Sequence, residues 1–141
     1  MLSQVCTITG LEPHIVQNWV KRGFVTAPVD KKYGKRQFCR IALLNALHEA
    51  LPLPVIVSTL EAAVKNGGTD EYALYLCFND AAYETENGEY HETAAKTAAA
   101  RGAASRSETS TLEKVLLVLL TAHQSARAKQ KSLLYFARLE L

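Results

Sequence analysis

The chain has 141 residues, of which 48% are hydrophobic and 21% are charged. This predicts one compact domain, or a small module followed by a further helical segment, with its own core. No charge-free stretch reaches the roughly 20 apolar residues of a membrane-spanning helix, and no basic segment precedes an apolar run at the start. The formal net charge is only +2, but residues 1–45 carry +5, residues 46–100 carry −7 and residues 101–141 carry +4. We therefore expect a cytoplasmic protein without a membrane partner and with a basic N-terminal module.

Two short helices are predicted at the start of the chain, over residues 3–9 and 13–22. Gly10 ends the first of them. Pro13 suits the first turn of the second, whose apolar positions recur at intervals of three and four residues until Gly23 ends it. Two short helices joined by a tight, glycine-containing turn form the helix-turn-helix pattern, in which the second helix enters the major groove of DNA.

Residues 24–38 have β-prone ends around a polar, basic turn, and this pattern predicts a small β-hairpin, or wing. An apolar stripe predicts a third helix over residues 36–50. A fourth helix is expected to begin at Pro52 and to end at the Gly67-Gly68 pair. Residues 1–66 are therefore predicted to form a compact winged helix-turn-helix module.

Several positions of this module share their spacing with a known family. They are Gly10, Leu11, Ile15, Val16, Trp19, Gly23, Phe24, Pro28, Arg36, Gln37, Phe38, Ile41, Leu44, Leu53, Ile56 and Leu60. In these positions the chain resembles the DNA-binding domain of MerR-type transcriptional regulators. It also resembles a group of small, poorly characterised bacterial proteins with the same winged domain and an Asn-Trp pair such as Asn18-Trp19. The resemblance covers about residues 2–65 and implies a winged fold that binds DNA.

The recognition helix departs from the MerR pattern. That pattern has a DNA-contacting arginine followed by two tyrosines where this chain has Gln17, Asn18 and Trp19. The arginine contact is missing, although Gln and Asn can bond to adenine edges or to phosphates. Activation of MerR-type proteins also depends on an effector site outside the DNA-binding domain, and nothing after residue 65 matches a metal-thiolate or drug-pocket pattern. Whether a small-molecule effector binds therefore stays open.

Candidate DNA contacts lie on the predicted recognition helix and on the predicted wing. Polar helix side chains can reach base edges, and flexible cations on a wing can neutralise phosphates without reading the sequence. A solvent-exposed polar surface without a ligand is the alternative for both sets. The candidates are His14, Gln17, Asn18, Lys21, Arg22, Lys31, Lys32, Tyr33, Lys35 and Arg36.

The second half of the chain is predicted to be helical. A helix with an aromatic stripe is expected over residues 70–87, capped by Thr69 or Asp70. The alanine-rich residues 93–105 predict either a helix that its neighbours approach closely or a partly ordered linker. Core packing is the favoured role for the aromatic stripe, with an aromatic effector pocket as the alternative.

A long helix is predicted from the capping box Ser110-Thr111-Leu112-Glu113 nearly to Leu141. Residues 115–120 are apolar on every face, so this helix is either the centre of a bundle or part of a dimer interface. We favour a homodimer formed through residues 69–141, because helix-turn-helix proteins commonly bind two half-sites as dimers. The candidate dimer contacts are Leu112, Val115, Leu116, Leu119 and Leu133.

No pattern for catalysis or metal binding is present in the sequence. Cys6, Cys39 and Cys77 lie far apart, and the four histidines form no ligand spacing typical of a metal site. A nucleophile elbow and a phosphate-binding glycine loop are also missing. We therefore expect no enzyme activity, no metal and no cofactor.

Together these patterns predict a mainly α protein, with a MerR-like winged helix-turn-helix module followed by a helical bundle or dimerisation region. Its expected partner is double-stranded DNA and its expected role is transcriptional regulation. Two alternatives remain. One is an excisionase-like recombination factor that bends DNA, against which the long C-terminal region argues. The other is a protein-interaction adaptor that has lost DNA binding, which the missing arginine permits.

Overall fold

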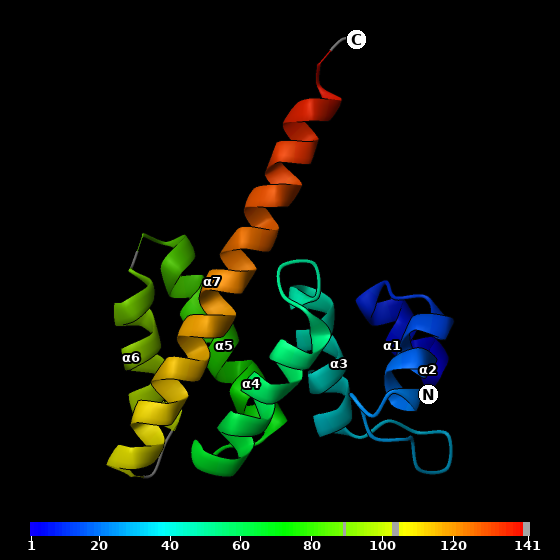
Figure 1. Cartoon of the computed structure of the whole chain (residues 1–141), viewed down its shortest axis with the longest axis horizontal. Coiled ribbons are helices and arrows are strands. Elements are labelled where there is room, and N and C mark those ends of the chain that lie inside the picture. Colours follow the sequence, from blue (N-terminus) through cyan, green and yellow to red (C-terminus); the bar gives the residue numbers. More distant parts are fainter. Residues whose placement is uncertain (89, 103–104, 140–141) are drawn as a thin grey trace.

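The computed structural model describes residues 1–88, 90–102 and 105–139, and these residues fold into helices (Figure 1). The helices are α1 (Leu2–Thr9), α2 (Pro13–Lys21), α3 (Lys35–Leu47), α4 (Leu53–Asn66), α5 (Glu71–Glu86), α6 (His91–Gly102) and α7 (Arg106–Ala137). No strand is present in the three described ranges, so the prediction of a mainly α protein is confirmed. Within the same ranges, none of the helices combines the length and the apolar character needed to cross a bilayer.

The first two helices pack against each other at one side of the molecule. Gly10 adopts a φ of 76° between them, and its N–H donates to the carbonyl of Cys6 over 2.9 Å. A residue with a side chain would be strained in this left-handed conformation, which explains the glycine at this turn. The buried side of α2 consists of Val16 and Trp19. The predicted pair of short helices with a glycine turn is therefore formed.

The segment between α2 and α3 forms a tight turn where a β-hairpin is predicted. Val29 and Lys32 make one isolated antiparallel bridge, with N–H to O=C distances of 3.1 and 2.9 Å. The bridge does not extend toward Thr26 and Ala27 because their backbone carbonyls bond to the Gln37 side chain and not to a partner strand. The Gln37 amide donates to the carbonyls of Thr26 and Ala27 over 3.1 and 2.8 Å. The predicted strand pair of the wing is therefore absent from the described residues 24–38.

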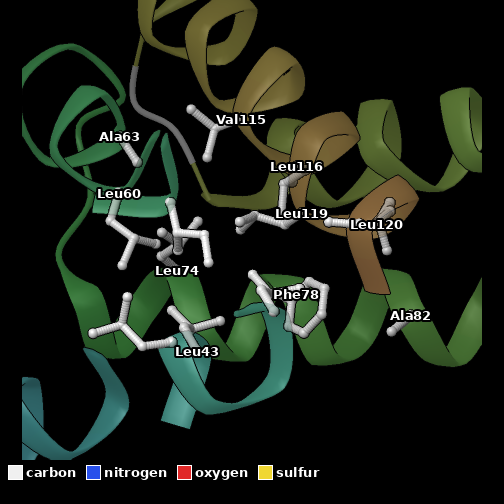
Figure 2. Packing of buried hydrophobic residues seen from close by; sticks show 14 of the residues in the cluster. Leu43, Leu60, Ala63, Leu74, Phe78, Ala82, Val115, Leu116, Leu119 and Leu120 are labelled. Carbon is white, nitrogen blue, oxygen red and sulfur yellow. The ribbon is translucent and has the colours of Figure 1, made fainter. Parts of the chain in front are cut away.

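One cluster of buried side chains extends through the molecule from Val5 to Ala122. Side chains from α3, α4, α5 and α7 point toward one another in its centre (Figure 2). The cluster continues across the predicted boundary between residues 66 and 69, because α3 and α4 both pack against α7. The N-terminal helices and the helical bundle therefore share a core.

The long helix α7 is the central element of this core. Leu116 and Leu119 are fully buried, and α4, α5 and α6 all pack against the helix. Four of the five predicted dimer contacts, Leu112, Val115, Leu116 and Leu119, lie inside the core of a single chain. Only Leu133, with 58% of its surface exposed, is available to a partner. The bundle alternative thus accounts for the apolar residues 115–120.

The start of α7 differs from the prediction. The helix begins five residues before the predicted capping box, and Ser105 is its N-cap. The Ser105 hydroxyl accepts from the Glu108 N–H, and the Glu108 carboxylate accepts from the Ser105 N–H, both over 3.2 Å. This reciprocal pair is a capping box, so the box predicted at Ser110 lies inside the helix. The helix ends at Ala137 with Arg138 as its C-cap, four residues before Leu141, so it runs nearly to the predicted end.

The helices α5 and α6 both form where the sequence predicts helical structure. Asp70 is the N-cap of α5, and its carboxylate accepts from the Ala73 N–H over 2.9 Å. The alanine-rich segment forms α6 over His91–Gly102, although residues 103 and 104 lie outside the described part. Four buried alanines face the core of the bundle: Ala94, Ala95, Ala98 and Ala99. Small side chains let α6 approach α5 and α7 closely, as the first alternative predicts.

The core position of Leu119 gives a first testable prediction. Leu119→Ala leaves a cavity in the buried cluster, so we expect the free energy of unfolding to fall by about 2–5 kcal/mol. Leu76→Ala is the matched control because Leu76 is 45% exposed, and we expect it to cost less than about 1 kcal/mol. Urea unfolding followed by circular dichroism measures both. Equal losses would contradict the central position of α7.

Candidate nucleic-acid interface

Helix α2 separates its side chains into a buried side and an exposed side. Val16 is fully buried, and Trp19 is 3% exposed and packs edge-on against the His48 ring, with 5.9 Å between ring centres. Trp19 is therefore a core residue, as its spacing predicts. Three candidate DNA contacts, Gln17, Asn18 and Lys21, lie on the exposed side. Positions three and four residues apart share one side of a helix, which places these polar groups together.

The turn after α2 presents two further cations. Asp30 and Lys31 have φ values of 51° and 63°, left-handed conformations that side chains rarely adopt. Two hydrogen bonds between Val29 and Lys32 close the turn around them. Lys31 and Lys32 are exposed, and neither has an ion-pair partner within the described ranges. The turn also contains the exposed carboxylate of Asp30, so its two lysines leave it with a net charge of +1.

Tyr33 follows the turn and is half-buried. Burial raises the pKa of its phenol, and the nearby Cys6 thiol adds to the shift. The hydroxyl therefore stays protonated at neutral pH and can donate a hydrogen bond.

The exposed side of α2 and the turn border one cavity of about 380 Å³. Gln17 and Val20 line it from α2, Lys31 and Tyr33 line it from the turn, and Leu2 lines it from the start of α1. The fold thus brings together candidates that lie 14 or more positions apart in the sequence. Gln17, Lys31 and Tyr33 belong to one continuous surface.

Other predicted contacts are engaged within the chain. The Lys35 ammonium lies 4.2 Å from the centre of the Tyr72 ring, and the Arg36 guanidinium lies 3.2 Å from a carboxylate oxygen of Asp70. Both residues therefore contact the start of α5 rather than the surface of α2. The Arg22 guanidinium stacks on its neighbour Phe24 at 4.5 Å from the ring centre.

His14, the last candidate, is exposed at the start of α2. Its Nδ1 atom lies 3.9 Å from a carboxylate oxygen of Glu12. An exposed pair at this distance contributes little to stability, so His14 remains accessible to a ligand.

Arg40 fixes the segment before the turn, and it is not among the candidate residues predicted from the sequence. Only 15% of its side chain is exposed. Its Nε atom donates to the Phe24 carbonyl over 2.6 Å, and its Nη atoms lie 3.4 Å from Glu61 and 3.5 Å from Glu71. This guanidinium joins the segment before the turn to α3, α4 and α5. No local pattern predicts the role, because its three partners lie 16 to 31 residues away.

No centre for catalysis is apparent in the described parts of the chain. Burial raises the pKa of the Cys39 and Cys77 thiols, which keeps them protonated and poorly nucleophilic. Burial also lowers the pKa of His123, whose ring packs edge-on against Phe78 with 5.4 Å between ring centres. Among the described residues no three His, Cys, Asp or Glu side chains are placed to hold a metal ion.

Comparison with known proteins places the chain in a family. Residues 2–84 match the family described as Domain of unknown function (DUF1836). This match covers more than half of the chain, and the protein belongs to that family. The matched range includes the first two helices, the turn, Arg40 and nearly all of α5. Neither a curated protein nor a solved structure matches the chain.

The position of Arg40 gives a second testable prediction. Arg40→Met leaves Glu71, itself 16% exposed, without its charged partner, so we expect a loss of about 3 kcal/mol in the free energy of unfolding. Arg36→Met is the matched control, because the side chain of Arg36 is 70% exposed and surface ion pairs are worth about 1 kcal/mol or less. Chemical denaturation of both variants measures the difference. Similar losses would show that Arg40 does not have this joining role.

Proposed function

We propose that the protein binds double-stranded DNA and acts as a transcriptional regulator, with α1, α2 and the basic turn as a MerR-like helix-turn-helix unit. The observation that supports this most strongly is the continuous surface formed by the exposed side of α2 and the turn. It combines polar side chains on a short helix with cations that have no ion-pair partner in the described residues. This combination suits a duplex, which presents base edges between two lines of phosphates.

In this proposal α2 lies in the major groove. Gln17 and Asn18 face the base edges, where an amide side chain can form two hydrogen bonds with adenine. Lys31 and Lys32 contact the phosphates beside the groove, and the turn takes the place of a β-wing. Both lysines are exposed, so their ammonium groups are accessible to phosphates. Lys35 and Arg36, which face α5, contribute less.

Three cations, Lys21, Lys31 and Lys32, are assigned to phosphates. Each neutralised phosphate adds roughly −0.9 to the slope of log affinity against log salt. Three contacts predict a slope of about −3, which corresponds to about a 40-fold loss of affinity between 50 and 200 mM salt.

Binding to duplex DNA over a salt series tests the proposal. The probes are random-sequence and genomic fragments, and fluorescence anisotropy is the measurement. We expect the triple variant Lys21→Ala, Lys31→Ala, Lys32→Ala to bind all sequences more weakly and to have a salt slope smaller by about 3.

The matched control removes the same charge from elsewhere on the surface. Lys65, Lys96 and Lys114 are exposed on α4, α6 and α7, and replacing all three with alanine is expected to leave the salt slope unchanged. Absence of wild-type binding at low salt would overturn the proposal and favour the protein-interaction adaptor. A sharp bend in the bound DNA would instead favour the excisionase-like alternative.

We further propose that the protein acts as a homodimer through the end of α7. This helix extends beyond the bundle (Figure 1), and every described residue from 127 to 139 is exposed. The segment has large apolar side chains that no part of the described chain covers: Leu133, Leu134, Tyr135, Phe136 and Leu139. A solitary helical segment of this length is marginally stable in water, so pairing with a second copy would stabilise it.

Light scattering after size-exclusion chromatography tests the dimer. We expect the wild type to have twice the mass of one chain and Leu133→Lys with Phe136→Lys to have the mass of one chain, because two buried lysines disrupt an apolar interface. The control is Ile8→Lys with Tyr90→Lys, since these side chains, in α1 and just before α6, are 71% and 79% exposed. A wild-type monomer at about 100 μM, or a variant that stays dimeric, would exclude this interface.

A further inference from the structure

The cavity between α1, α2 and the turn has the dimensions and the lining of a ligand pocket. Its volume of about 380 Å³ lies within the range of pockets that hold small molecules. Apolar side chains from three segments form most of its wall: Leu2 from α1, Val20 from α2, and Pro28 and Tyr33 from either side of the turn. All four are half-buried, so part of each faces the cavity.

The charge of the lining is of one sign. Lys31 contributes the only charged side chain among the described lining residues, and it has no ion-pair partner in the described ranges. Met1 also lines the cavity and carries the N-terminal ammonium group, which donates to the Gln4 side-chain oxygen over 3.2 Å. No carboxylate lines the cavity. The uncharged polar groups are the Ser3 hydroxyl, the Gln17 amide and the Tyr33 hydroxyl, each of which can donate a hydrogen bond.

We propose that this cavity binds a small aromatic carboxylate. The flat apolar body would lie between Leu2, Val20 and Pro28, and the Tyr33 ring is available to pack against it. The carboxylate would face Lys31, where a charge-assisted hydrogen bond is about twice as strong as a neutral one. A neutral molecule of the same shape loses this contact, and a cation is repelled.

The turn holds Lys31 in position before a ligand arrives. Asp30 and Lys31 keep left-handed backbone conformations inside the closed Val29 to Lys32 bridge. The side of the turn from which Lys31 extends is therefore set by the backbone. A preorganised cation loses less conformational freedom on binding than one on a flexible loop.

Binding of the carboxylate to the cavity does not depend on the proposed function. An effect of the carboxylate on DNA affinity does rest on the proposed function. If α2 and the turn contact DNA, then Gln17 and Lys31 belong both to the cavity and to the DNA surface. An aromatic carboxylate in the cavity would neutralise Lys31 and compete with the phosphate. The ligand would then lower the affinity for DNA, which would make the pocket an effector site within the DNA-binding surface.

Calorimetric titration of the full chain with 2-naphthoate and its uncharged analogue 2-naphthamide tests the site. We expect one naphthoate to bind per chain with a Kd below about 1 mM, as the typical affinity per heavy atom predicts. The amide should bind at least about fivefold more weakly. Amide NMR shifts of Val20 and Tyr33 should change with the same saturation curve, which locates the ligand.

Two neighbouring lysines provide the matched pair of variants. Lys31→Gln should weaken naphthoate binding about fivefold and leave naphthamide binding unchanged. Lys32→Gln removes an equally exposed charge that does not line the cavity, so its naphthoate affinity should stay within about twofold of the wild type. Lack of saturable binding to several millimolar, equal losses in the two variants, or equal affinity for acid and amide would each overturn the proposal.

A competition experiment separates this inference from the proposed function. Naphthoate added at about its wild-type Kd should lower the anisotropy of labelled DNA for the wild type, and about fivefold more naphthoate should be needed for the same effect on Lys31→Gln. If the protein fails to bind DNA, the calorimetric result still decides the ligand site. If it binds both without competition, the pocket stands and its role as an effector site is excluded.

Discussion

The structure depends on the burial of α7 within its apolar stretch 115–120, where Val115, Leu116, Leu119 and Leu120 are buried and Val118 is 38% exposed. This stretch is apolar on every face, and a helix of that kind is stable only where neighbours cover it on several sides. Helices α4, α5 and α6 supply the cover, and the alanines of α6 allow the closest approach. The path of the chain after residue 66 follows from this requirement. The same burial removes four predicted dimer contacts from the surface, whereas the projecting end of α7 exposes large apolar side chains that a partner can reach.

The N-terminal unit is attached to this bundle by a polar contact as well as by apolar packing. Arg40 lies on α3 between the Phe24 carbonyl and the carboxylates of Glu61 and Glu71. A guanidinium with little exposure needs such partners, because removing its charge from water is costly. Through Phe24 the position of the turn is thus coupled to α4 and α5, although the cavity beside the turn is lined from α1, α2 and the turn.

Local rules predicted those elements whose ends are decided by local chemistry. Gly10, Pro13 and Asp70 end or begin helices as expected, because each acts through its own backbone or a neighbouring N–H. The rules failed where two local solutions compete. Ser105 and Ser110 both begin the Ser-x-x-Glu sequence pattern of a capping box. The box forms at Ser105, so α7 starts about a turn and a half earlier than predicted. The predicted wing failed because Gln37, from the next helix, bonds to the backbone that a partner strand would need.

The predicted DNA-contacting set was divided by tertiary contacts that composition cannot reveal. Residues 1–45 have a net charge of +5 in the sequence, but acids from the acidic middle of the chain neutralise part of it. Asp70 pairs with Arg36, while Glu61 and Glu71 pair with Arg40. The two left-handed residues of the turn place Lys31 beside α2, and the start of α3 faces α5 instead. Within residues 1–45, Lys21, Lys31 and Lys32 are exposed cations of α2 and the turn without an ion-pair partner in the described residues, and such charge at one surface favours the binding of an anion there.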